Sequence, residues 1–284
     1  MELEPIGVVH SPVTDTHSMP PLGVPAQVEV YEPYASGLLD IESNTHIVIA
    51  SWMHLADRST LRLDGIGPDN LPLKKGVFAV RSPARPNPLA VSTSRLLRVE
   101  NNLLFLERLD MIDGTEVVDI KGYTRGGECI FSARSFWDYI PPSQLKPGRA
   151  FELILEQARS FHGKLCAGVV AGAKLVAHVA EHWDAATRDD DLVFVASRNV
   201  RDSGCLIDAI MGSTGATFGN GRLNIISDGT LRAYWKGKSL TYKPRRGGRI
   251  GADVALGLSA HEIFEIEEKN GVFDYSGPRE GCEV

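Results

Sequence analysis

Short apolar runs, separated by turn residues, recur through the first half of the chain. They are HIVIASW at 46–52, GVFAV at 76–80, LLFLERL at 103–109 and EVVDIKGY at 116–123. Runs of this length that are rich in Val, Ile and Phe are typical of β-strands, and closely spaced short strands are typical of a small barrel or sandwich. We therefore expect the first half of the chain to be all-β.

The pattern changes near residue 145. The segment PPSQLKPGR at 141–149 contains three prolines and no apolar periodicity, which indicates a stiff linker. After it, apolar residues recur at helical spacing and predict helices at 151–158 and 168–183.

Strand-like runs follow these helices, at 192–195, 222–229 and 231–242. Asp228-Gly229, between the last two runs, is a candidate hairpin turn. The second half is thus predicted to be α+β.

Composition limits the class of protein. The chain has 284 residues, a net charge of −6 and four cysteines without a CxxC pair. Its length suits two domains of roughly 100 to 200 residues each. It lacks an apolar run near the ~18 residues that a membrane span needs, and the start MELEP is unlike a secretory leader. We expect a cytoplasmic protein with reduced cysteines.

The most informative local feature is the loop after residue 80. Arg81 and Arg85 lie among three prolines, which fix φ and remove backbone donors, so the segment must be a stiff and exposed loop. A guanidinium binds a carboxylate or phosphate with two parallel hydrogen bonds. The pattern indicates an anion-binding loop, although an arginine in a turn is often only a surface charge.

Five motifs in the first half occur together in one known family. They are PIGVVHSP at 5–12, GVPAQ at 23–27, WMHLADR at 52–58, GVFAVRSPARPNP at 76–88 and LDMIDGTEVVDIKGY at 109–123. In these motifs, residues 1–145 resemble the TsaA/TrmO family. The resemblance implies a β-barrel methyltransferase that uses S-adenosylmethionine, methylates threonylcarbamoyl-adenosine in tRNA and forms a homodimer with donor pockets near the subunit interface.

The resemblance also implies which residues bind the methyl donor. The predicted donor-binding residues are Pro25, Ala26, Gln27, His54, Leu55, Arg81, Arg85, Val91, Asp110, Met111, Ile112 and Asp113. Arg81 suits the donor carboxylate, and Asp110 or Asp113 suits its ribose diol or amine. The family usually has arginine at the position of Ala26, so one contact to the donor or to RNA is expected to be missing.

The acceptor nitrogen must lose a proton, so the site needs a base. Asp119, Lys121 and Tyr123 are the catalytic candidates. Asp119 and Lys121 alternate on one strand face, which is also the pattern of a solvated ion pair, and Tyr123 is equally consistent with packing in a barrel. The residue types leave the identity of the base open.

The second half carries its own motifs: FHGKLCAG at 161–168, CLIDAIMGSTGATFGNGRL at 205–223 and LSAHEIFEI, a closing helix, at 258–266. These resemble the FmdE family, named after a subunit of formylmethanofuran dehydrogenase. The resemblance implies an α+β domain over 150–268 that binds a metal, followed by a C-terminal tail at 269–284.

His162, Cys166 and Cys205 are the predicted metal ligands. The first two are four residues apart, a spacing that puts both on one face at the start of a helix. With Cys205 they would form a three-ligand site with an open position for zinc or another thiophilic metal. Lys164 and Ala216 replace a histidine and a cysteine of the family pattern, and packing in the core is the alternative role for the cysteines.

Charge argues against a nucleic-acid substrate. Residues 1–147 contain 13 Lys and Arg against 18 Asp and Glu, whereas nucleic-acid binders normally carry a basic face. One basic cluster lies in a stretch without acidic residues between Asp228 and Asp253, and it could contact phosphates or be only a solvated hairpin. Its members are Lys236, Lys238, Lys243, Arg245, Arg246 and Arg249. Besides tRNA, the acceptor could be a small molecule or metal-bound thiol presented by the second domain, and the chain could instead be a non-catalytic metal carrier or sensor.

Overall fold

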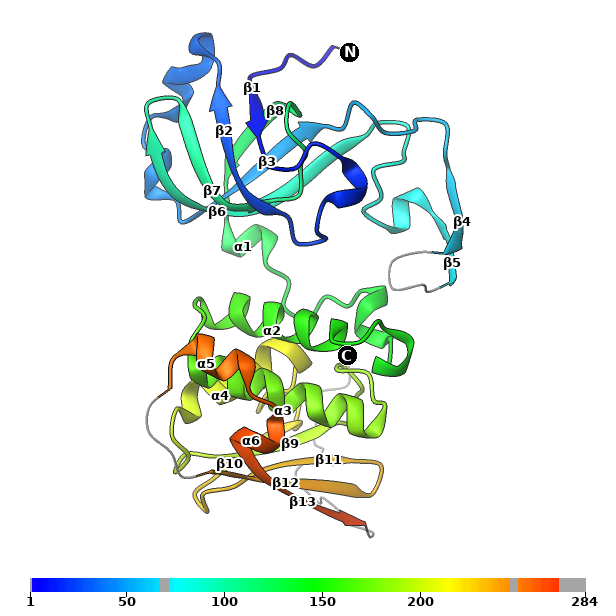
Figure 1. Ribbon diagram of the computed structural model, residues 1–284, viewed down its shortest axis with the longest axis vertical. Helices are drawn as coiled ribbons and strands as arrows, with labels where there is room; N and C mark the ends of the chain where they lie inside the picture. The colour runs from blue at the N-terminus through cyan, green and yellow to red at the C-terminus, as the bar shows by residue number, and fades with distance from the viewer. Residues whose placement is uncertain (1, 67–71, 246–249, 271–284) are drawn as a thin grey trace. The chain divides into compact units, whose positions relative to one another are not determined.

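The computed structural model describes residues 2–66, 72–245 and 250–270. The chain divides into two compact units, and the second begins at Phe131 (Figure 1). Among the described residues, no helix has the length and apolar content needed to cross a bilayer.

The first unit is a closed six-stranded barrel in the order β1-β2-β7-β6-β3-β8. All neighbours are antiparallel, and β1 pairs with β8 to close the ring. The strands are β1 Gly7–His10, β2 Val24–Val30, β3 His46–Trp52, β6 Leu89–Glu100, β7 Leu103–Leu109 and β8 Glu116–Gly122. The predicted barrel and its strands at 46–52, 103–109 and 116–123 are confirmed.

Alternating side chains fill the barrel. In β3, Ile47 and Ile49 are fully buried while their neighbours face outward, and Leu104 and Leu106 of β7 do the same. This alternation follows from the period of two in a strand, and it fixes the register because a slip of one residue would turn the apolar set to water.

The strand predicted at 76–80 is wrong. Gly76 ends β5 (Pro72–Gly76), which pairs only with β4 (Arg62–Ile66) in a two-stranded ribbon, and Val77–Ala79 form the 3-10 turn η5. Arg85 accounts for the turn, because its guanidinium binds the carbonyls of Val77 and Val80, which a neighbouring strand would otherwise need. The rest of the first unit is the helix α1 (Arg125–Glu128) and three 3-10 turns: η1 Thr16–Ser18, η2 Glu32–Leu38 and η3 Ile41–Ser43.

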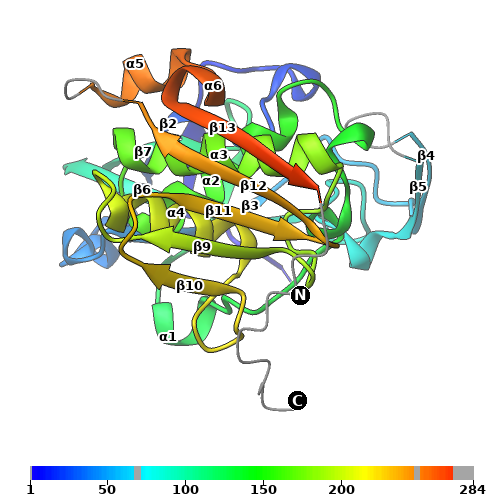
Figure 2. The same cartoon turned by 90° about the horizontal axis from the view of Figure 1, so that it is seen from below.

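The second unit is a five-stranded sheet in the order β10-β9-β11-β12-β13 with helices packed on one face (Figure 2). Only β9 and β10 are parallel. The strands are β9 Val193–Ser197, β10 Leu223–Ile226, β11 Leu231–Trp235, β12 Lys238–Pro244 and β13 Phe264–Asn270. The helices are α2 Arg149–His162, α3 Ala167–Trp183, α4 Ser203–Thr214, α5 Ala252–Gly257 and α6 Ala260–Ile263, preceded by the 3-10 turns η6 Phe136–Tyr139 and η7 Pro142–Gln144. The predicted α+β class is confirmed.

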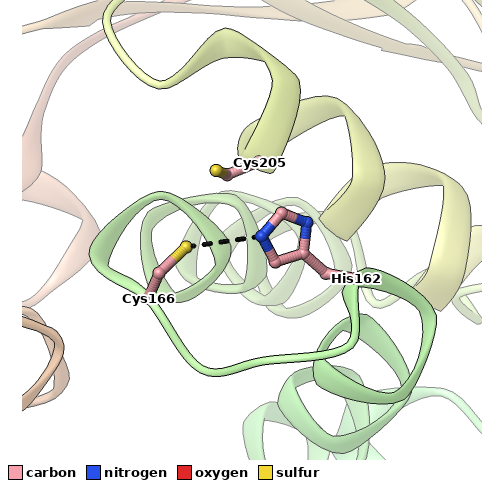
Figure 3. Close-up of side chains that lie close together, drawn as sticks. All are labelled: His162, Cys166 and Cys205. Carbon is pink, nitrogen blue, oxygen red and sulfur yellow. Dashed lines mark hydrogen bonds between the residues drawn. The ribbon is translucent and has the colours of Figure 1, made fainter.

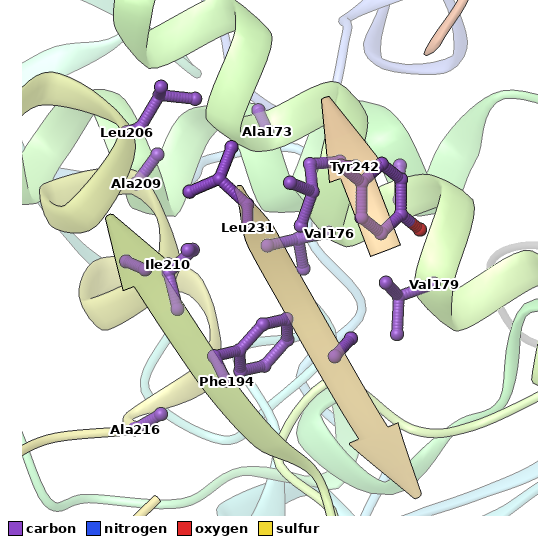
Figure 4. Close-up of a cluster of buried hydrophobic side chains, with 14 of the residues drawn as sticks. Ala173, Val176, Val179, Phe194, Leu206, Ala209, Ile210, Ala216, Leu231 and Tyr242 are labelled. Carbon is purple, nitrogen blue, oxygen red and sulfur yellow. The ribbon is translucent and has the colours of Figure 1, made fainter. Parts of the chain in front are cut away.

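The core of this unit joins helices to sheet (Figure 4). Val176 of α3 and Ile210 of α4 pack in one buried cluster with Phe194 of β9 and Leu231 of β11. Tyr242 of β12 is also fully buried, and its hydroxyl group lies 2.8 Å from Nδ1 of His178, so that its polar group has a partner.

The hairpin turn is not at Asp228-Gly229. The hairpin lies between β11 and β12, where Trp235 pairs with Lys238 and the two-residue loop Lys236-Gly237 has φ of 46° and 79°. Two positive φ values are what a type I′ turn requires. Asp228 instead accepts hydrogen bonds from Thr230, and the strand before it, β10, pairs with β9 rather than β11.

Two predicted boundaries also differ. The expected linker at 141–149 lies inside the second unit, because Ser143 donates to Asp184 through both its amide and its hydroxyl, and Arg134 forms two hydrogen bonds with Asp190. The expected helix at 258–266 ends at Ile263, and Phe264 begins β13 beside β12. Residues 271–284 of the predicted tail lie outside the described residues.

Two glycines set the distance between α3 and α4. A Cβ atom on Gly172 would lie 2.6 Å from Cβ of Ala209 and 3.0 Å from the carbonyl oxygen of Leu206. A Cβ atom on Gly168 would lie 2.6 Å from Cβ of Cys205. The two helices therefore touch through backbone, and any larger residue must push them apart.

We predict opposite effects for two glycine-to-alanine substitutions in these helices. Gly172→Ala should destabilise the protein by about 1–3 kcal/mol, because overpacking outweighs the roughly 1 kcal/mol that alanine contributes in a helix. Gly204→Ala in α4, where an added Cβ meets open space, should stabilise it. Urea unfolding midpoints measure both, and a stabilised Gly172→Ala variant would contradict the packing argument.

Candidate functional sites

The arginine loop of the first unit is held together by one of its own arginines. Arg85 donates from Nε to the carbonyl of Ser82 at 2.7 Å and from Nη2 to the carbonyls of Val77 and Val80 at 3.1 and 2.6 Å. These hydrogen bonds satisfy backbone carbonyls that a neighbouring strand would otherwise bind, in a loop whose prolines prevent regular secondary structure. Arg85 is predicted to contact S-adenosylmethionine, but most of its N–H groups form hydrogen bonds within the loop.

Arg81 is the exposed arginine of this loop. Its Nη1 donates to the carbonyl of Val91 at 3.1 Å, which ties the side chain to the first residues of β6. The next residue, Ser92, donates its hydroxyl to Asp110 at 2.5 Å. Arg81 and Asp110 are thus tied to neighbouring residues of β6, and a cation together with a carboxylate suits recognition of a zwitterion.

Further predicted residues line a cavity of about 400 Å³ beside β2. Pro25 and Gln27 of β2 and Asp113 line it together, and Asp113 accepts a hydrogen bond from the amide of Ser11 at 3.0 Å. Ala26 also lines it, yet its side chain belongs to the barrel core.

The remaining predicted donor residues fall into two groups. His54 and Leu55 are exposed on the loop after β3, which is tied to the arginine loop where Arg58 donates to the carbonyl of Pro86 at 3.0 Å. Met111 is buried in the barrel core, and the carbonyl of Ile112 accepts the hydroxyl of Thr115 at 2.7 Å. Arg58, which also stacks 5.5 Å from the ring centre of Trp52, was not identified from the sequence.

The three candidates for the base lie on or just after β8. Asp119 and Lys121 form an ion pair, and burial raises the pKa of Tyr123. Asp119 lines a different cavity, of about 340 Å³, with Tyr34 and Ile41. The structure therefore does not bring these candidates to the cavity lined by Gln27 and Asp113.

In the second unit the three predicted metal ligands do converge (Figure 3). Nε2 of His162 and the sulfur atoms of Cys166 and Cys205 all lie within 4.8 Å of one another, and the sulfur of Cys166 is 3.7 Å from Nε2. The reason differs from the predicted one. His162 ends α2, Gly163 reverses the chain with φ of 89°, and Cys166 precedes the first turn of α3, so the pair meets across a turn rather than along one helix.

Asp208 orients the histidine. Its carboxylate lies 2.8 Å from Nδ1 of His162, which leaves Nε2 directed at the two thiols. A carboxylate bonded to the second nitrogen is the usual support of a metal-bound histidine. Asp208 was not among the residues predicted from the sequence, although its position three residues after Cys205 in a helix places it on the same face.

The donor set fits a thiophilic metal. Burial, and then the neighbouring Cys166, raises the pKa of the Cys205 thiol to about 11, so without a cation the sulfur of Cys205 stays protonated. Two sulfurs and one nitrogen suit zinc and leave one tetrahedral position open. Ala216, at the position of a family cysteine, is buried in the hydrophobic core and offers no fourth ligand.

Family comparisons agree with this division of the chain. Residues 8–128 match the model for the tRNA-methyltransferase O N-terminal domain, and residues 161–264 match the model "FmdE, Molybdenum formylmethanofuran dehydrogenase operon".

Relatives extend the comparison. A probable S-adenosyl-L-methionine-binding protein of Archaeoglobus fulgidus is 30% identical over 253 residues, which cover 84% of this chain and 66% of the relative. An S-adenosyl-L-methionine-binding protein of the same organism is 38% identical over 134 residues, covering 46% of this chain and 94% of the relative. A putative S-adenosylmethionine-dependent methyltransferase RcsF of Pseudomonas aeruginosa is 32% identical over 173 residues, covering 58% and 71%.

Solved structures of TrmO are also similar. The crystal structure of TrmO from Pseudomonas aeruginosa is 18% identical, with a TM-score of 0.41 over 86% of this chain and 93% of that chain. On the matches to the family models and to the curated relatives, the chain belongs to the TrmO family of S-adenosylmethionine-binding proteins and carries an FmdE domain in its second half.

Proposed function

We propose that the barrel transfers a methyl group from S-adenosylmethionine to the N6-threonylcarbamoyl-adenosine of tRNA. The observation that carries the proposal is the arginine loop, in which Arg85 fixes the backbone and Arg81 stays exposed beside the Ser92–Asp110 pair. The family name tRNA-methyltransferase O and the names of the relatives support the donor and the substrate class.

The donor supplies an activated methyl group, so the protein mainly positions the reactants. Arg81 would bind the donor carboxylate, Asp110 its amine, and Asp113, in the cavity with Gln27, its ribose diol. Of the candidate bases, Asp119 lines a cavity and forms an ion pair with Lys121.

A second copy of the chain completes this proposal. Leu55, Leu61 and Phe78 lie around the arginine loop in sequence and are 66%, 59% and 83% exposed. Large apolar side chains exposed to this degree are typical of surfaces that meet a partner. We therefore propose a homodimer that covers the apolar residues of this loop.

We predict that Arg81→Ala weakens binding of S-adenosylmethionine by ten- to a hundredfold, since a charge-assisted contact contributes about 1.5–3 kcal/mol. Arg95→Ala, which removes an exposed arginine from the same strand as Val91, is the matched control and should leave affinity unchanged. Calorimetric titration measures both, and equal affinity in wild type and Arg81→Ala would exclude Arg81 as a ligand.

We predict that the protein incorporates labelled methyl groups into tRNA that carries threonylcarbamoyl-adenosine and not into tRNA made without it. Arg81→Ala should lose most of this activity. Incorporation into neither tRNA, together with intact donor binding, would favour the alternative of a small-molecule or metal-bound thiol acceptor.

We also propose that the second unit binds zinc or another thiophilic metal through His162, Cys166 and Cys205, with Asp208 as support. The convergence of three donor atoms within 4.8 Å carries this proposal. A metal carrier or sensor without catalysis is the alternative role of this unit.

We predict about one zinc per chain after reconstitution in wild type and in Cys129→Ser, whose cysteine is exposed in the first unit. Cys166→Ser and Cys205→Ser should retain little zinc, and Asp208→Asn should bind it about 10- to 100-fold more weakly. Elemental analysis after dialysis measures the content. Equal zinc in all variants would leave the cysteines as core residues.

A further inference from the structure

A cavity of about 680 Å³ opens beside the proposed metal site. It is lined by the loop before α3, the segment before α4, the end of β12 and the helices α5 and α6. Cavities of this size hold small organic ligands. Cys166 and Cys205 both belong to its wall, so a ligand in the cavity would meet their sulfur atoms.

The chemistry of the wall changes from floor to rim. The floor is buried and apolar, with Val200, Leu206 and Phe264 each under 7% exposed. The rim carries exposed cations, Lys164 and Arg201 near the two cysteines in sequence and Arg245 at the end of β12. An apolar floor with a few polar groups at defined positions is the usual composition of a ligand site.

Two acidic residues also line the cavity, and one of them is already engaged. The carboxylate of Glu262 accepts hydrogen bonds from the amide and the hydroxyl of Ser259, both at 2.8 Å, in a capping box at the start of α6. Asp202 is exposed at the start of α4. Arg245 forms an ion pair with Glu265 at 3.7 Å, so Lys164 and Arg201 are the lining cations considered for a ligand.

We propose that this cavity binds an acidic thiol with an apolar body. The thiol reaches the wall formed by Cys166 and Cys205, the apolar body lies on the floor, and the oxyanion meets Lys164 and Arg201. The inference rests on the metal site proposed above, because a site with three protein ligands leaves one position for an external sulfur ligand. It names the substrate class of the second unit.

The test compares three probes with the same six-carbon chain on zinc-loaded full-length protein: 6-mercaptohexanoate, hexanoate and 6-mercaptohexanol. Calorimetry should show the tightest binding for 6-mercaptohexanoate, which alone carries both groups. Lys164→Ala/Arg201→Ala should weaken its binding about five- to tenfold while leaving 6-mercaptohexanol unchanged. Lys146→Ala/Arg198→Ala removes two exposed cations that do not line the cavity and should change neither.

Zinc content, measured before and after titration, separates the two proposals. If wild type holds no zinc, the metal site fails and this inference fails with it. If zinc is held, and the double variant binds 6-mercaptohexanoate as tightly as wild type, only the inference is overturned. Removal of zinc from the protein by the probe would also overturn it, whereas retained zinc with cation-dependent binding supports it.

Discussion

The second unit depends on the close approach of α3 and α4. Gly168 and Gly172, four residues apart, bring the backbone of one helix against the side chains of the other. The same contact that packs the core against Ala209 holds Cys205 beside the start of α3, where Cys166 precedes the helix. The positions of the three candidate metal ligands therefore depend on helix packing. Without it, Cys166 and Cys205 would not lie close enough to share a metal.

In the first unit, the exposed charge of Arg81 lies on a loop without regular secondary structure, so this loop needs other contacts to keep its conformation. Prolines remove the donors that would pair the loop with a strand, and Arg85 takes over by binding three carbonyls. Arg85 thus has a structural role, and the loop that it stabilises holds Arg81 in place. Replacement of Arg85 would affect the site through loop order, whereas replacement of Arg81 acts on the exposed guanidinium itself.

Periodicity was sufficient to predict much of the fold. Strands at 46–52, 103–109 and 116–123 alternate in burial, and α3 has its apolar stripe against the sheet, so local pattern and tertiary environment agree. The errors occurred where a tertiary contact decides local structure. The guanidinium of Arg85 turns residues 77–79 away from a strand, and the insertion of β9 between β10 and β11 removes the hairpin expected at Asp228. Arg85 is five and eight residues from the two carbonyls that it binds, and β9 is still farther in sequence from Asp228, so the periodicity of a single strand reports neither contact. The contact between Asp208 and His162 could not be predicted from local pattern either, because it forms only when α4 packs against the end of α2.

Charge in the sequence and charge in space also differ. Lys236 and Lys238 lie at the hairpin end of β12, and Lys243 and Arg245 lie at its other end, about 20 Å away at roughly 3.3 Å per residue. Strand β13 then places Glu265 beside Lys243 and within 3.7 Å of Arg245. The described part of the basic cluster is thus split between the two ends of β12, and acidic residues partly neutralise its charge. Lys236, 4.5 Å from the ring centre of Trp235, keeps an aromatic neighbour suited to stacking, but one such pair gives few phosphate contacts. If the proposed tRNA substrate is correct, the described residues offer few phosphate contacts, so the affinity for tRNA would decrease only moderately with salt.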